Sequence, residues 1–144
     1  MFSKACEYAI KAMVYIATQS LENKRVKVTG IANNSDSPEA FTAKIMGELK
    51  RADLVDSFTG PNGGFEIDIN KMRQIKISEI VTVIDGDNVY NGCAIGLDEC
   101  NPDEPCPLHE KFASIRNDLK EMLEHTTIYE LAIKFKSGKT TLIR

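Results

Sequence analysis

Residues 37–69 read SPEAFTAKIMGELKRADLVDSFTGPNGGFEIDI, and they point most directly to the fold. The first part predicts a helix that continues to about Ala52, because Ser37 is a favoured N-cap residue and Pro38 suits the first helical position. Apolar residues recur along it at helical spacing: Phe41, Ile45, Met46 and Leu49. We expect this stripe to face a hydrophobic core.

The second part of the segment predicts a β-hairpin. Apolar and polar residues alternate over 54–58 and again over 65–69, and the turn between them is TGPNGG. Upstream, residues 29–34 predict a short helix, and Ser35-Asp36 predicts a turn. A helix, a tight turn, a second helix and then a hairpin are typical of a winged helix-turn-helix, which inserts its second helix in a DNA major groove.

The remaining elements are predicted to be helices. One spans residues 3–20 and carries Cys6 on its apolar face, where we expect the thiol to be buried. Ser78 is expected to cap a short helix that ends near Ile84, and Thr127 to cap the last helix. Between them, residues 108–124 form a helix with a long apolar stripe, which favours a dimer seam. The predicted fold class is mainly α, with a small β-hairpin wing and a long C-terminal dimerisation helix.

Charge divides the chain into two parts. The 144 residues carry a net charge of -3. Residues 1–76, the expected DNA-binding domain, have 11 basic and 9 acidic residues, whereas residues 77–144 have 7 and 12. No apolar run reaches the length of about 18 residues that a membrane span needs, and the N-terminus has no secretory pattern. We therefore expect a cytoplasmic protein that does not bind membranes.

Three cysteines and a histidine lie close together in an acidic segment without periodicity, residues 86–106 and the start of the next helix. Cys93, Cys100, Cys106 and His109 have the spacing C-x6-C-x5-C-x2-H. In a cytoplasmic protein such cysteines indicate metal or redox chemistry rather than disulfides. From the residues alone, an iron–sulfur cluster and a zinc ion suit this set about equally.

Two other protein classes fit the sequence less well. A small electron carrier needs the cysteine segment but has no use for a wing. A hydrolytic enzyme needs a nucleophile with its base, a phosphate loop or a carboxylate pair, and the sequence contains no such arrangement. We therefore expect that the protein is not an enzyme.

The chain resembles the Rrf-two family of winged-helix regulators, the group that contains the iron–sulfur regulator IscR and the nitric-oxide sensor NsrR. The resemblance covers nearly the whole chain. It is carried by Tyr8-Ala9, Ile31-Ala32, SPEAFTAKI at 37–45, the wing GPNGGF at 60–65 and the three cysteines.

This resemblance implies a homodimeric repressor or activator that binds a palindromic operator in double-stranded DNA. It also implies a 2Fe–2S or 4Fe–4S cluster on Cys93, Cys100 and Cys106, which senses redox state, nitric oxide or cluster supply. The fourth ligand would be His109, or an acidic residue from the first helix of the other subunit, which matches Glu7. Some relatives hold no cluster, so a member that senses a metabolite, or that switches through zinc or thiols, is the alternative.

The residues that would read DNA lie at the start of the second helix and at the tip of the wing. Short and charged side chains there can touch thymine methyl groups, cytosine N4, guanine or phosphate, and small wing residues can approach a minor groove. The expected residues are Ser37, Glu39, Ala40, Thr42, Ala43, Lys44, Asn62 and Gly63.

Overall fold

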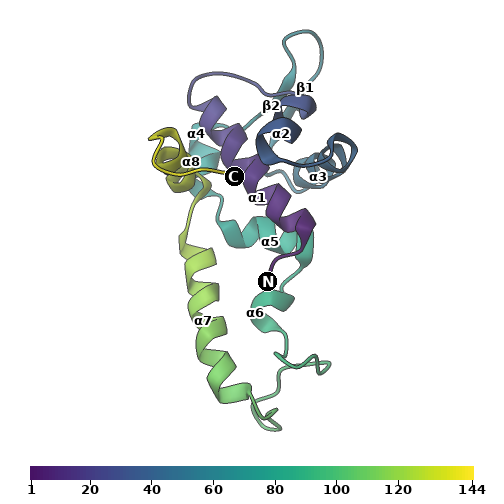
Figure 1. Cartoon of the computed structure of the whole chain (residues 1–144), viewed down its shortest axis with the longest axis vertical. Helices are drawn as coiled ribbons and strands as arrows, with labels where there is room; N and C mark the ends of the chain where they lie inside the picture. Colours follow the sequence, from purple (N-terminus) through teal and green to yellow (C-terminus); the bar gives the residue numbers. More distant parts are fainter.

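The computed structural model describes all 144 residues and is mainly helical (Figure 1). Its elements follow the chain in this order: α1 (Lys4–Ser20), α2 (Val28–Ser35), α3 (Glu39–Arg51), β1 (Asp56–Phe58), β2 (Gly64–Glu66), α4 (Ile69–Gln74), α5 (Ile77–Asp85), α6 (Asn88–Asn91), α7 (His109–His125) and α8 (Ile128–Lys136). The two strands form one antiparallel sheet. The predicted fold class, helices with one small hairpin, is confirmed.

The helix-turn-helix consists of α2 and α3. Asp36 makes the turn between them in the left-handed region, with a φ of 50°. The prediction that Ser37 caps α3 is wrong. Pro38 is the N-cap residue, and its carbonyl accepts the N–H of Thr42 at 2.9 Å. Because Pro38 keeps an extended backbone, with ψ at 136°, helical geometry starts only at Glu39.

The wing is a shorter hairpin than the alternating pattern predicted. Its register sets Ser57 opposite Phe65. On the other side of β2, Val26 from the loop after α1 also pairs with Phe65, through N···O distances of 3.0 and 2.8 Å. The wing is therefore attached to the loop after α1 through its backbone.

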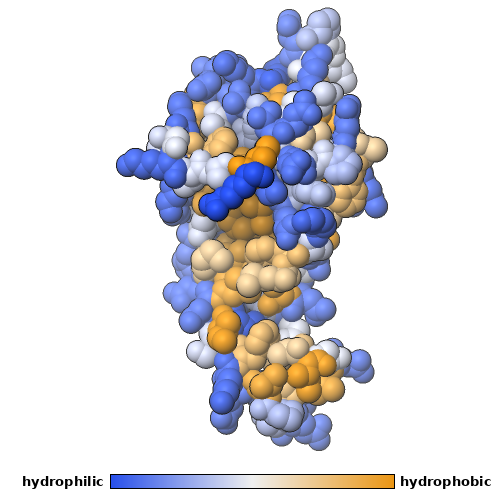
Figure 2. Space-filling model, in the orientation of Figure 1, coloured by the Kyte–Doolittle hydropathy of each residue, from blue (hydrophilic) through white to orange (hydrophobic).

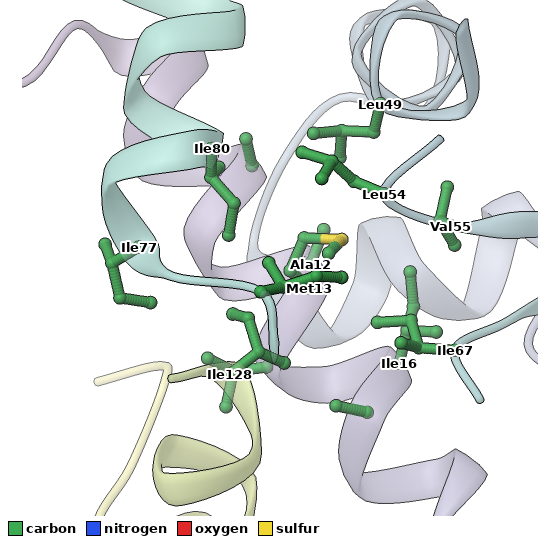
Figure 3. Packing of buried hydrophobic residues seen from close by; sticks show 14 of the residues in the cluster. Ala12, Met13, Ile16, Leu49, Leu54, Val55, Ile67, Ile77, Ile80 and Ile128 are labelled. Carbon is green, nitrogen blue, oxygen red and sulfur yellow. The ribbon is translucent and has the colours of Figure 1, made fainter. Parts of the chain in front are cut away.

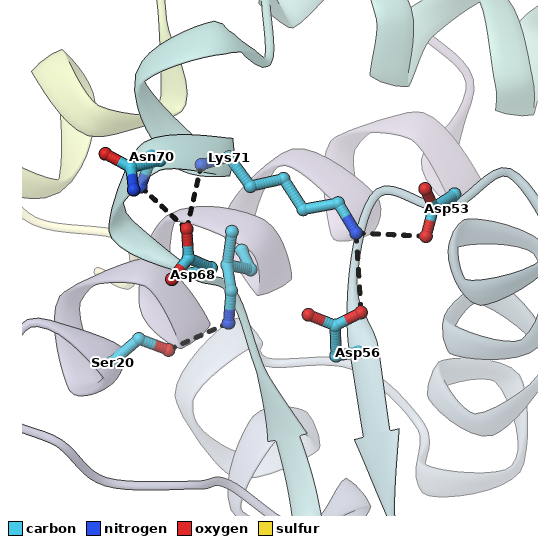
Figure 4. Close-up of polar contacts among 7 residues, drawn as sticks. Ser20, Asp53, Asp56, Asp68, Asn70 and Lys71 are labelled. Carbon is cyan, nitrogen blue, oxygen red and sulfur yellow. Dashed lines mark hydrogen bonds and ion pairs between the residues drawn. The ribbon is translucent and has the colours of Figure 1, made fainter.

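The second strand ends early because α4 begins there. The carboxylate of Asp68 accepts the N–H groups of Asn70 and Lys71, at 2.9 and 3.4 Å (Figure 4). The ammonium group of Lys71 then reaches Asp53 and Asp56, at 3.0 and 3.4 Å. These contacts join α4 to the chain that enters β1.

The hydrophobic core is one cluster of 24 buried residues, and α1 runs through it. Met13 and Ile16 of α1 are fully buried, and Leu49, Ile80 and Ile128 reach them from α3, α5 and α8 (Figure 3). This packing fixes α3 on the same support as the helices that follow the wing.

Backbone pairing at the far end of α7 sets the start of α5. The prediction that Ser78 caps this helix is wrong: the N-cap is Lys76, whose N–H donates to the carboxylate of Glu79 at 2.7 Å. The next N–H, from Ile77, donates to the carbonyl of Thr126 at 3.0 Å. Ile75 and Lys76 are thus held in an extended conformation, and α5 begins at Ile77.

The expected reading head, which consists of α2, α3 and the wing, lies at the opposite end of the long axis from the cysteine segment. Figure 1 shows α2, α3 and the wing at one end, and residues 92–108 at the other. Within the segment expected to be irregular, the short helix α6 is held by buried Tyr90, whose hydroxyl lies 2.6 Å from that of Thr82. None of the helices combines the length and apolar character that a membrane span requires.

Candidate nucleic-acid interface and cysteine site

The outer face of α3 begins with four exposed residues: Glu39, Ala40, Ala43 and Lys44. Thr42 was expected to share this face, and that expectation is wrong, because Thr42 is only 2% exposed. Its hydroxyl donates to the carbonyl of the N-cap residue at 2.9 Å. A threonine one turn into a helix often satisfies its hydroxyl in this way, which turns the side chain inward.

Two of the expected DNA-reading residues also bind within the protein. Ser37 is half-buried, and its hydroxyl lies 2.5 Å from that of Thr42. Glu39 accepts a hydrogen bond from the hydroxyl of Thr29 at 3.1 Å, which joins α2 to α3. The side chains of this face without an internal polar partner are those of Ala40, Ala43 and Lys44.

The wing tip has an exposed residue and a buried one. Asn62 is exposed, as expected, but Gly63 is buried. A Cβ atom at position 63 would collide with the carbonyl oxygen of Phe58 and would lie 2.8 Å from the carbonyl carbon of Thr59. Gly63 therefore shapes the turn from inside, and the expectation that it faces DNA is wrong.

Arg25 holds the wing, a role that could not be predicted from its place in a polar loop. Its guanidinium carbon lies 3.7 Å from the centre of the Phe58 ring. The same side chain donates to Glu66 at 3.1 Å and to the carbonyl of Asn62 at 3.2 Å. One arginine thus contacts both strands and the tip, which fixes the wing against the body of the protein.

A groove of about 680 Å³ lies between the loop after α1 and the wing. Lys24, Arg25 and Lys27 line one side, and Asn62 lines the other. The groove is mainly polar, and its basic side chains are of the kind that bind phosphate.

The four candidate ligands of the cysteine segment form two pairs. The Cys100 sulfur lies 3.3 Å from Nδ1 of His109. The Cys106 side chain lies near the Cys93 thiol and lowers its pKa. No three metal-ligating side chains gather around one point. The donors have the soft chemistry that iron–sulfur clusters and zinc require, but they are not arranged around a single ion.

The environment of Cys93 favours its thiolate. The backbone N–H groups of Ile95 and Leu97 donate to its sulfur and lower its pKa, and Cys106 and Gly96 contribute in the same direction. Gly96 makes this turn possible, because its φ of 81° is readily adopted only without a side chain. Thiolates are the form of cysteine that binds metals and reacts with oxidants.

The comparison with known families decides the identity of this fold. A family model named Rrf2 and described as "Iron-dependent Transcriptional regulator" matches residues 2–134. The chain belongs to the Rrf2 family. A protein of Aquifex aeolicus that is named as an HTH-type transcriptional regulator is 31% identical over 133 residues, covering 91% of this chain and 90% of its own. This Rrf2 protein is therefore a DNA-binding transcription regulator.

Solved structures of Rrf2-like regulators share its fold. CymR, the global cysteine regulator of B. subtilis, superposes with a TM-score of 0.75 at 24% identity, covering 93% of this chain and 97% of CymR. The IscR of T. potens gives a TM-score of 0.74 at 19% identity, covering 98% and 92%. The winged helix of this Rrf2 protein is confirmed by both.

The sequence predicted roles for two residues of α1. Cys6 is fully buried, as predicted, and burial together with the neighbouring Asp85 raises the pKa of its thiol to about 12. Glu7 pairs with Lys4 at 3.1 Å. In this Rrf2 protein Glu7 does not join the cysteine segment of its own chain, which lies beyond α6 (Figure 1).

Proposed function

We propose that this protein is a homodimeric Rrf2 regulator whose operator binding is controlled by an iron–sulfur cluster. Cys93, Cys100 and Cys106 are the protein's sulfur ligands, and His109 is the fourth ligand. The observation that carries the proposal is that all four donors lie at one end of the molecule, with the Cys100 sulfur 3.3 Å from His109 and Cys106 near Cys93. The matching family model, described as iron-dependent, supports the same chemistry.

Two pairs of donors favour a 2Fe–2S cluster over zinc. A structural zinc ion requires four ligands arranged tetrahedrally around one point. A 2Fe–2S cluster takes two protein ligands on each of two irons, and histidine can replace cysteine there. His109 is the better candidate than Glu7, because its ring already contacts Cys100. When bound, such a cluster supplies a one-electron redox centre that is sensitive to oxidants and nitric oxide.

The reading head supports contact with a major and a minor groove. Ala40, Ala43 and Lys44 form the free face at the start of α3. Alanine can contact a thymine methyl group and lysine can reach guanine or phosphate. Asn62 at the wing tip is exposed for the adjacent minor groove, and the polar groove beside it suits the phosphate backbone.

The face of α7 supports a dimer. Its apolar residues alternate at spacings of four and three, the pattern of a coiled-coil seam: Leu108, Phe112, Ile115, Leu119 and Met122. Leu108, Ile115 and Met122 are 47%, 64% and 50% exposed in the single chain. Figure 2 shows apolar surface gathered over the half of the molecule that contains α7. A second copy of the chain, applied through a twofold axis, would cover it.

The contact that can transmit the state of the cysteine segment lies at its beginning. Asp85, the residue before the segment, accepts the backbone N–H of Ser3 at 2.9 Å and also the Ser3 hydroxyl. Ser3 in turn caps α1 by accepting the N–H of Cys6 at 3.0 Å. A shift of the segment would therefore act on α1, which packs against both helices of the reading head.

The decisive experiment is an anaerobic preparation of the wild-type chain and of a variant with Cys93, Cys100 and Cys106 changed to alanine. Iron, sulfide, zinc and the visible spectrum are measured, with binding to DNA upstream of the protein's own gene. We expect two irons and two sulfides per chain in the wild type only, and altered operator affinity in the variant. A colourless wild type without iron, which binds DNA as the variant does, would refute cluster control.

One observation favours a second candidate, a thiol switch. Cys93 has a lowered pKa and Cys106 lies beside it. A peroxide could oxidise this pair: a disulfide forms, the peroxide O–O bond breaks, and two thiol protons leave with the oxygens as two waters. An iron-free protein whose operator affinity changes on peroxide treatment, and recovers with dithiothreitol, would support this candidate instead. Zinc at one per chain without iron would indicate the zinc version.

A further inference from the structure

Arg116 on α7 contacts the cysteine segment at two places. Its Nη1 atom donates to the carbonyl of Gly92 at 2.7 Å and to the sulfur of Cys100 at 3.0 Å. Gly92 directly precedes Cys93. A single nitrogen atom therefore joins the backbone beside the first cysteine to the side chain of the second.

The position of Arg116 on α7 adds a third link. It lies seven residues after His109, which is two turns along the helix and on nearly the same face. His109 and Arg116 approach the Cys100 sulfur from the same helix, at 3.3 and 3.0 Å. The Nε atom of Arg116 is buried and has no hydrogen-bond partner. Burying this group without a partner costs free energy, which the contacts of Nη1 offset.

We propose that Arg116 is a positioning residue for the sulfur ligands: it holds Cys100 and the backbone at Cys93 in one arrangement and attaches both to α7. The proposal rests on the function given above, because it assigns Arg116 to the same site. A guanidinium group forms strong, charge-assisted hydrogen bonds with sulfur that carries negative charge. It therefore orders the segment before any metal binds and stabilises negative charge on the sulfur afterwards.

Two consequences can be measured separately. In metal-free protein, the contacts restrain residues 93–101, so protease sites there open rarely. In loaded protein, a cation and an N–H donor beside a ligand sulfur favour the reduced, more negative cluster. Loss of Arg116 should therefore expose the segment and lower the reduction potential.

The experiment compares three variants of the full chain: Arg116→Gln, Arg116→Lys and Lys111→Gln. Lys111 is exposed on the same helix, so Lys111→Gln removes one positive charge without touching the segment. Metal-free protein is digested with a glutamate-specific protease, and cleavage after Glu99 and Glu104 is timed by mass spectrometry. Anaerobic loaded protein is titrated for its midpoint potential, and thermal melting checks the global fold.

For Arg116→Gln we expect about tenfold faster cleavage after Glu99. We also expect about a tenfold smaller reduction equilibrium constant, which is about 59 mV for one electron. Arg116→Lys keeps a charged donor near the sulfur and should recover most of both effects, which a purely space-filling role would not predict. Lys111→Gln should behave as the wild type.

Equal cleavage rates in Arg116→Gln and Lys111→Gln would overturn the proposal. A failure to recover in Arg116→Lys, with normal melting, would also overturn it. The digestion uses no metal, so it decides the role of Arg116 in the segment even if the wild-type chain proves to hold no iron and the cluster proposal fails.

Discussion

The exposed face of α7 predicts how strongly one substitution should weaken the proposed dimer. Ile115 lies in the middle of the apolar seam and is 64% exposed in the single chain. The substitution Ile115→Asp replaces the most exposed seam residue of α7 with a charged residue. Because Ile115 is exposed, the core of the single chain stays intact.

The expected magnitude follows from the exposed area. Complete burial of an isoleucine side chain contributes about 1.5–3 kcal/mol, so the exposed share of Ile115 should contribute roughly 1–2 kcal/mol. A twofold interface buries the residue in both copies, which gives roughly 2–4 kcal/mol per dimer. This corresponds to a Kd for dimerisation that is about 30-fold to 1,000-fold weaker. Two aspartates near the axis would repel each other and move the result toward the upper value.

Sedimentation velocity over a range of protein concentrations measures this Kd directly. The matched control is Asn117→Asp, because Asn117 is exposed on α7 outside the seam and the variant gains the same charge. Circular dichroism should give the same helix content for both variants. A dimerisation Kd that is unchanged in Ile115→Asp would refute the seam, and a monomeric wild type would refute the homodimer.

Three further predictions concern the wing, the thiol of α1 and the reading helix. Gly64→Ala should destabilise the protein by about 1–3 kcal/mol in urea unfolding, because position 64 has φ 132° and a Cβ would lie 2.8 Å from the carbonyl oxygen of Val26; stability equal to wild type would contradict this. Since the pKa of Cys6 is raised to about 12, its thiol should stabilise the fold below pH 9 and lose that contribution as the pH rises toward 12; Cys6→Ala should show a weaker loss over the same pH range. Lys44→Ala should weaken operator binding and reduce the salt slope by about 1 if it meets a phosphate, whereas a slope that stays constant would assign Lys44 to a base or to solvent.

The sequence predicted most of the fold because the longer helices and the hairpin each carry a local signal, whereas the short helices α4 and α6 were not predicted. Glycine, proline and asparagine concentrate at 59–64, where the chain must reverse, and apolar spacing marks the helices on both sides. These signals depend only on neighbours in sequence. Helix starts were predicted less well: Ser37 and Ser78 are both good capping residues, but Pro38 stays extended and the pairing of Ile77 with the α7–α8 connection begins α5 earlier.

The candidate sites were predictable in composition but not in arrangement. The four donors of the cysteine segment stand out by spacing, whereas their division into two pairs depends on how the segment folds back on α7. Arg25 was missed because its hydrogen-bond partners lie 37 and 41 residues away along the chain. Arg116 was missed because its partners lie 16 and 24 residues away. Thr42 and Gly63 look like surface residues in sequence, and only their contacts with Pro38 and Phe58 reveal that they face inward.

A signal from the cysteine segment has to cross most of the molecule to reach α3. The free energy of the N-cap of α1 has the magnitude that such coupling requires. The cysteine segment starts directly after Asp85, which binds Ser3, and Ser3 caps the helix that supports the reading head. Loss of an N-cap costs about 0.5–2 kcal/mol. Coupling between two sites in regulatory proteins is typically about 1–3 kcal/mol, or about 5-fold to 150-fold in affinity. Under the proposed cluster control, a change at Asp85 therefore needs to break no more than this one cap to alter operator affinity by a useful factor. The core around α1 can stay intact while it does so.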